Sequence, residues 1–395
     1  MGSNPLLGVV FHWLGGLASG SFYVPYRKVK RWSWETYWLV GGIFSWIIAP
    51  WLLGSLMTSD LLGVLRASPR SSIAWAYIFG VLWGLGGLTF GLTMRYLGMS
   101  LGMAVALGFT AAFGTLVPPI FRGQFASEVL GTRSGVTILI GVGICMLGIV
   151  FAGAAGTMKE REMSEEQKRA SIKEFDLKKG LLVATFSGVM SSCFAYGLAA
   201  ADPIKAESVR HGTAVLWQGL PALVVVLLGG FTTNFLWCLF LNIRNHSGFE
   251  YFSTYASHPR NSTDTVPAIE NPTDAPAEEM ARADKHKVPA SPAPHDLPLV
   301  VPMLSNYFFC ALAGTTWYFQ FFFYTMGETQ MGRYKFSSWT LHMASIIIFS
   351  TLWGIALKEW NGAGPRTKFM VALSLATLIA STAIVGYGNY LGTHS

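Results

Sequence analysis

The chain has 395 residues, of which 52% are hydrophobic and 12% are Asp, Glu, Lys or Arg. A soluble protein carries roughly 25% charged residues, so the charges here are too few to cover the surface of a soluble protein of this length. The net charge of +7 is concentrated in particular loops and does not indicate a nucleic-acid partner. Lipid is therefore expected to be the main solvent, which leaves helices or closed barrels. The apolar runs are about twenty residues long and do not alternate, which predicts helices.

Ten apolar runs are long enough to cross a bilayer core of roughly 30 Å. In chain order they are Pro5–Pro25, Tyr37–Met57, Ile73–Met94, Met99–Phe121, Gly135–Gly156, Gly180–Ala200, Thr213–Leu241, Val300–Met326, Ser337–Leu357 and Phe369–Leu391. With five spans in each half, the second half starts from the opposite face of the membrane, as in many secondary transporters. We therefore predict an all-α integral membrane protein of ten transmembrane helices arranged as two inverted five-helix repeats.

Two polar segments divide the predicted spans. The first repeat is expected at residues 1–157, a charged cytoplasmic linker at 158–179, and the second repeat at 180–395. Residues 242–298 interrupt the second repeat, and most of this segment is rich in Pro, Asp, Glu, Thr and Ala. Such a composition buries too little apolar area to offset the entropy of ordering the chain. We therefore predict a disordered cytoplasmic loop at 242–298.

The basic residues predict the orientation in the membrane. Of the 28 Lys and Arg residues, 20 fall in loops on one side of the predicted spans and 8 on the other. Loops rich in Lys and Arg stay in the cytoplasm, so both termini are predicted to lie outside, in the periplasm. We expect a multi-pass protein of the inner membrane, surrounded by the lipid bilayer, and the sequence is compatible with a homodimer.

Few strongly polar side chains fall inside the spans, where such residues are costly and indicate function. His12, Gln218, Gln320 and His342 come from four different spans. Counting residues from the span ends predicts that all four lie at similar depth, in the outer half of the membrane. They form either one shared cavity or separate hydrogen bonds between helices, and the sequence leaves both readings open.

Aromatic residues crowd the same region, and Trp339 precedes His342 by one helical turn. Sugar sites pair aromatic faces with a few hydrogen-bonding groups in a mostly apolar pocket. An interfacial belt of Trp and Tyr is the alternative reading. The predicted substrate-binding residues are Trp13, Gln218, Trp317, Gln320 and Trp339.

No Asp or Glu lies at the middle of a predicted span. A proton-driven carrier needs a group whose pKa can cross the working pH, and His is the natural one. We therefore predict His12 and His342 as proton-coupling residues, with Glu328 at a span end as the third candidate. The chain has no G-x-S-x-G, H-E-x-x-H or phosphate-loop motif, so no enzyme is predicted. No metal site and no cofactor are expected beyond the proton as coupling ion.

Several long, aromatic-rich strings spread over nearly the whole chain carry a family resemblance. They are Tyr23–Thr36, Gly91–Ser100, Trp317–Tyr324, Ser338–Met343 and Leu357–Asn361. On these strings the sequence resembles the L-rhamnose–proton symporter family of the drug/metabolite transporter superfamily. The resemblance implies two inverted five-helix repeats and a central cavity lined by helices one, three, four, six, eight and nine. It also implies uptake of L-rhamnose, or a closely related sugar, with protons.

His12, Gln320 and His342 fall on positions that match the family's pattern, whereas Glu328 and the long loop at 242–298 depart from it. The hypothesis is a secondary active transporter that imports L-rhamnose by proton symport and alternating access. One alternative is a facilitator or exporter of the same fold that works without protons, whose flux would ignore a collapsed pH gradient. Another is a membrane sensor or scaffold that signals through the long loop and fails when that loop is deleted.

Overall fold

The computed structural model describes residues 3–97, 99–162, 176–255 and 300–394. Within these residues the chain is almost entirely helical, and the β-structure present is one isolated bridge between Tyr255 and Val300. The long helices of the first half are α1 (Pro5–Ser21), α3 (Trp34–Gly42), α4 (Ala49–Met57), α6 (Arg70–Leu97), α7 (Met99–Phe121) and α8 (Arg133–Glu162). Those of the second half are α10 (Leu177–Ala200), α12 (Leu220–Asn245), α14 (Met303–Thr329), α15 (Ser337–Ala356) and α16 (Pro365–His394).

Shorter helices extend or connect the long ones. The π-helix η1 (Ile43–Ile48) joins α3 to α4, so that these three elements make one continuous span. The other short elements are α2 (Tyr23–Tyr26), α5 (Leu61–Ala67), the π-helix η2 (Phe125–Leu130), α11 (Asp202–Arg210) and the 3-10 helices η3 (Val215–Trp217) and η4 (Gly248–Tyr251).

Within the described residues, nine helical segments are long and apolar enough to cross a membrane. They include all the predicted spans except the eighth, which is α14. That helix has 27 residues, but its Trp, Tyr, Asn, Gln and Thr side chains lower its hydropathy below that of the others. The prediction of an all-α integral membrane protein is therefore confirmed.

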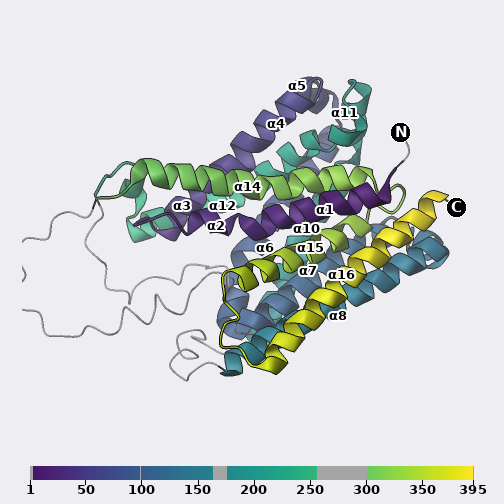
Figure 1. The fold of residues 1–395 in the computed structure, drawn as a ribbon. Coiled ribbons are helices and arrows are strands. Elements are labelled where there is room, and N and C mark those ends of the chain that lie inside the picture. Colours follow the sequence, from purple (N-terminus) through teal and green to yellow (C-terminus); the bar gives the residue numbers. More distant parts are fainter. Residues whose placement is uncertain (1–2, 98, 163–175, 256–299, 395) are drawn as a thin grey trace, which may run out of the picture.

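The helices pack in a bundle with both termini at one end, here called the termini end (Figure 1). The short helices α5 and α11 also lie toward this end. Helix α1 packs on α14 and α15, α8 packs on α16, and α6 packs on α10 and α12. In the first turn of α1, the Asn4 side chain accepts a hydrogen bond from the Leu7 amide, and Pro5 occupies the first helical position.

Some element boundaries differ from the sequence prediction. Helix α12 begins at Leu220 rather than Thr213, with Pro221 in its first turn, and it continues to Asn245. The 3-10 helix η4 follows, so the described start of the predicted loop 242–298 is folded. Helix α8 runs into the predicted linker as far as Glu162, whose carboxylate accepts hydrogen bonds from the Gly364 amide and the Thr367 hydroxyl. Most of the predicted linker and loop, residues 163–175 and 256–299, lies outside the described residues.

Close helix crossings depend on glycine. Helices α6 and α12 cross where Gly80 meets Gly229, and a methyl group on Gly229 would fall on the carbonyl oxygen of Tyr77. Small residues at such crossings let the two backbones approach each other.

The Gly229→Ala variant is expected to lower the Tm of the purified protein in detergent by several degrees. The added methyl meets backbone on the neighbouring helix, and overpacking of this kind costs about 1–3 kcal/mol. The matched control is Gly143→Ala in α8, where the added methyl would have no described neighbour within 4 Å apart from the backbone of its own helix turns. Equal Tm values for the two variants would contradict the packing argument.

Candidate functional site

Two histidines from different helices face the same tyrosine in the interior. His12 of α1 and His342 of α15 are both completely buried. Each imidazole lies edge-on to the ring of Tyr324 in α14, with ring centroids 5.2 Å apart in both pairs. Neither ring nitrogen of either histidine has a hydrogen-bond partner among the described residues. A buried polar group left without a partner costs about 1–3 kcal/mol, so hydrogen bonding between helices does not account for these two histidines among the described residues.

Glycines bring the three helices around this pair together. A methyl on Gly15 of α1 would lie 2.7 Å from the carbonyl oxygen of Gln320 in α14 and 3.5 Å from Nδ1 of His342. A methyl on Gly327 of α14 would lie 2.8 Å from Nε2 of His12. On the other side of α1, the Ser345 hydroxyl of α15 donates to the carbonyl oxygen of His12. Contacts from both α14 and α15 therefore hold His12 in position.

Aromatic rings extend from the histidines toward the opposite end of the bundle. Phe321 of α14 lies 5.7 Å from His342 and 5.2 Å from Trp317, measured between ring centroids. It also stacks on Phe194 of α10 at 3.8 Å. Phe194 in turn stacks on Trp339, whose indole N–H donates to the carbonyl oxygen of Thr110 in α7. These rings connect the His12–His342 pair to Trp317 through an apolar interior.

A small pocket lies beyond Trp317, where the π-helix η1 interrupts the second span. Its volume is about 10 Å³, enough for one water molecule. Its lining residues are Phe22, Tyr26, Trp38, Gly42, Ser45, Trp46, Gly314 and Trp317. π-helical turns inside α-helices occur frequently at functional sites. The aromatic lining suits the apolar face of a sugar, although the pocket in this conformation is too small to hold one.

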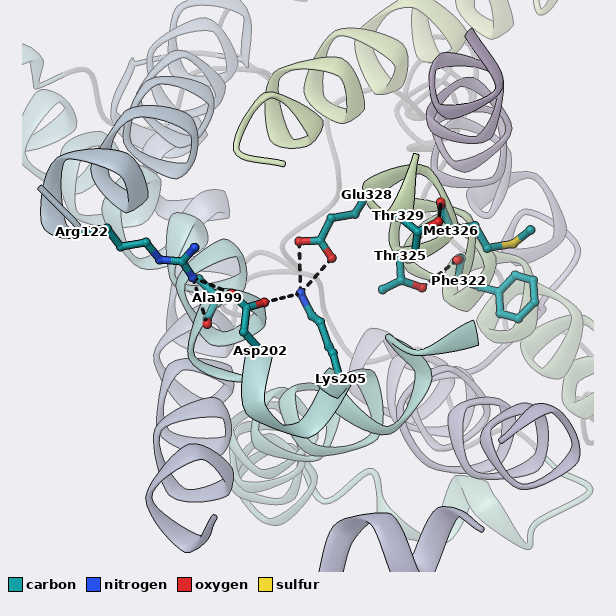
Figure 2. A network of polar contacts seen from close by, with 9 residues as sticks. All are labelled: Arg122, Ala199, Asp202, Lys205, Phe322, Thr325, Met326, Glu328 and Thr329. Carbon is teal, nitrogen blue, oxygen red and sulfur yellow. Dashed lines mark hydrogen bonds and ion pairs between the residues drawn. The ribbon is translucent and has the colours of Figure 1, made fainter. Parts of the chain in front are cut away.

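An ion-pair network occupies the termini end (Figure 2). The Lys205 ammonium of α11 lies 2.8 and 3.1 Å from the two carboxylate oxygens of Glu328 in α14, and 3.2 Å from Asp202. Arg122, at the end of α7, donates to Asp202 at 2.7 Å and to the carbonyl oxygen of Ala199. The Lys205 side chain is 4% exposed and that of Glu328 is 12% exposed. The third proton-coupling candidate is therefore tied into a salt bridge.

The structure brings some of the predicted site residues together. His12, His342 and Trp339 meet where α1, α14 and α15 pack, and Trp317 is joined to them through Phe321. Gln320 is placed beside them by its backbone carbonyl oxygen, which lies against Gly15 of α1.

Two predicted residues lie elsewhere. Trp13 packs edge-on against Phe349 of α15, with ring centroids 6.0 Å apart. Gln218 precedes α12 instead of lying within it, at the end of η3. Its neighbours Trp217 and Gly219 contact Phe322 and Thr325 of α14, so Gln218 lies beside the last turns of that helix.

Sequence reasoning missed several residues of this region. Tyr324 follows Gln320 by four residues, on the same face of a helix, and this spacing was available as a signal. Phe194 carried no signal, since phenylalanine occurs in every predicted span. In the sequence, Lys205 was only one of the eight basic residues on the side of the spans with fewer Lys and Arg. Its burial could not be predicted, because it depends on how α11 folds back on the bundle.

Comparison with known proteins identifies the family. The family described as "L-rhamnose-proton symport protein (RhaT)" matches residues 1–255 and 289–390. The L-rhamnose-proton symporter of Klebsiella pneumoniae (strain 342) is 35% identical over 384 residues, which cover 97% of both chains. Those of Cronobacter sakazakii and Salmonella paratyphi B are 33% and 34% identical over the same share of both chains. The chain belongs to the L-rhamnose–proton symporter family.

Proposed function

We propose that this protein imports L-rhamnose, or a closely related sugar, together with protons across the inner membrane. The observation that carries the proposal is the buried pair His12 and His342, whose ring nitrogens have no partners among the described residues. The relatives named as L-rhamnose-proton symporters support the choice of sugar and ion. The pair supplies two groups that can take up a proton, and the adjoining rings supply the apolar surface that a deoxy sugar requires.

We further propose ten spans with α14 as the eighth, and both termini in the periplasm. At 1.5 Å per residue, the 27 residues of α14 extend about 40 Å, more than the bilayer core requires. An even number of spans agrees with the two termini lying at one end (Figure 1).

The packing supports two inverted five-helix repeats. If the first five spans correspond in order to the second five, then α1 corresponds to α10, α6 to α14, and α7 to α15. Helix α1 packs on α14 and α15, and α10 correspondingly packs on α6 and α7. The second span, made of α3, η1 and α4, would correspond to the seventh, α12. Helix α6 packs on α12, and its counterpart α14 packs on α3 and η1. The last spans of the two halves, α8 and α16, pack on each other, which is compatible with a twofold axis between them.

Coupling would arise from the apolar surroundings of the histidines. A protonated imidazole without hydrogen bonds is strongly disfavoured in such surroundings. Sugar hydroxyl oxygens can accept the N–H bonds of His12 or His342, and the amide of Gln320 offers a further polar partner. Trp317 and Trp339 would cover the apolar faces of the ring. Proton and sugar would then stabilise each other's binding, and together they would favour one conformation of the carrier.

The proposal is tested by uptake of radiolabelled L-rhamnose into proteoliposomes, with and without an inward acid gradient. For one proton per sugar, a gradient of one pH unit should give about tenfold accumulation, since both correspond to the same free energy. A protonophore should reduce the accumulation to equilibrium. Uptake that equilibrates without accumulation would indicate a facilitator. Absence of uptake beyond protein-free liposomes would exclude L-rhamnose as the substrate.

A further inference from the structure

The ion pairs at the termini end connect helices that otherwise belong to different parts of the bundle (Figure 2). Helix α11 packs mainly on α12, α5 and α6, whereas α14 packs most extensively on α1. Lys205 reaches from α11 to Glu328 at the end of α14, and Asp202 of the same short helix pairs with Arg122 at the end of α7. Charged side chains thus join α11 to both α14 and α7.

The network combines burial with complete charge compensation. The Lys205 side chain is almost fully buried, and the Glu328 side chain is largely so. The two cations and two carboxylates balance, and Lys205 contacts both carboxylates at once. Removing one partner of a buried ion pair is strongly destabilising, because it leaves the other charge buried and unpaired. Lys205 has a second partner on its own helix, since Asp202 lies 3.2 Å from its ammonium group.

Glu328 is also coupled to the candidate site through its own helix. It directly follows Gly327, which packs against the imidazole of His12, and it lies one helical turn after Tyr324, which faces both histidines. Thr325, on the same turn, lies against Gly219 at the start of α12 and is 1% exposed. The end of α14 therefore closes over the histidines while its glutamate is held by α11.

We propose that the Lys205–Glu328 pair is a latch that closes the termini end of the transport path, with Lys205 as a positioning residue of the transport cycle. The proposal rests on the proposed transport function. Opening the path at this end separates Glu328 from Lys205, and Lys205 then stays paired with Asp202, which Arg122 holds in place. The latch favours the closed conformation without itself contacting the sugar.

A cysteine reporter tests the latch without requiring transport. Thr325→Cys places a thiol one turn inside Glu328, and the four native cysteines are buried and serve as the background in the unsubstituted chain. The rate of labelling by a polar maleimide is measured on the folded protein in detergent. Adding Glu328→Gln, which keeps the shape and removes the charge, is expected to raise the rate on the order of tenfold, which corresponds to about 1.4 kcal/mol.

The matched control is Arg210→Gln in the same reporter background. Arg210 lies on α11 and pairs with Glu207 of its own helix, and its side chain is 69% exposed. Its removal should leave the labelling rate unchanged. An unchanged rate with Glu328→Gln would overturn the latch, and so would an equal rise with Arg210→Gln, which would indicate general loosening of α11.

A cross-link then tests whether the latch must open during transport. In the Lys205→Cys/Glu328→Cys double variant, a cleavable bifunctional thiol reagent should abolish L-rhamnose uptake, and reduction should restore it. The two single-cysteine variants should be unaffected by the reagent. Full uptake in the cross-linked protein would overturn the proposal, and if the double variant does not transport, the labelling result decides. Failure of the transport function itself is recognised separately, since the unsubstituted protein would then show no proton-driven uptake.

Discussion

The His342→Gln variant should lose sugar accumulation completely, so that L-rhamnose inside proteoliposomes equals the external concentration even under an acid gradient. Glutamine keeps a neutral hydrogen-bonding group of similar size but cannot carry a proton at working pH. Because the imidazole it replaces is fully buried beside Tyr324, the substitution removes the proposed proton site and retains most of the packing. The measurement is the steady-state ratio of internal to external sugar, with His12→Gln treated in parallel.

His246→Asn is the control for this experiment. His246 is exposed at the end of α12 and has a left-handed backbone with φ of +51°, a conformation that asparagine tolerates well. The control should accumulate sugar as the unsubstituted protein does. If both His342→Gln and His12→Gln still accumulate sugar, the proton is carried elsewhere and the assignment of the pair is wrong.

A single methyl group on α14 should have nearly as large an effect. In Gly327→Ala the new methyl would lie 2.8 Å from Nε2 of His12, closer than ordinary packing permits. His12 cannot retreat freely, because its helix is held against Ser345 of α15. The initial rate of gradient-driven uptake is expected to fall at least about tenfold, the effect of roughly 1.4 kcal/mol.

Gly143→Ala again provides the control, since its methyl has open space among the described residues. A double variant shows whether the methyl group of Gly327→Ala slows uptake by displacing His12. If the methyl acts by displacing His12, then Gly327→Ala should cost little further activity in a His12→Gln background, because coupled sites are not additive. Additive losses would show that Gly327 acts through another neighbour.

The helices were largely predictable, because hydropathy and span length are properties of short stretches of sequence. Helix α7 was predicted and is observed at Met99–Phe121. The ends were less predictable, since the backbone hydrogen bonds continue where the apolar run stops. Helix α8 therefore continues through charged residues to Glu162. Helix α12 begins late, because the chain first forms the 3-10 turn η3 ahead of Pro221.

The arrangement of the candidate site could be predicted only in part, because the sequence does not determine how each helix is rotated about its axis. His12 and His342 were identified because polar groups are rare in apolar spans. Trp13 follows His12 by one residue, which turns its side chain about 100° around the helix axis, and it faces Phe349 instead. Which rings meet across helices, such as Phe194 with Phe321, is decided by crossing positions that a single sequence does not reveal.

If the histidines carry the proton as proposed, the ring-packed interior should also limit the leakage of protons through the carrier. Protons cross a membrane along files of water, and a buried water needs two to four polar partners. Between His342 and the pocket beside Trp317 the space is occupied by the rings of Phe321 and Phe194, whose carbons offer no such partners. In the proposed mechanism, a proton on the histidines in this conformation meets these rings instead of a row of polar groups. We therefore expect little proton leakage without sugar, and proton transfer across the membrane only when the helices move.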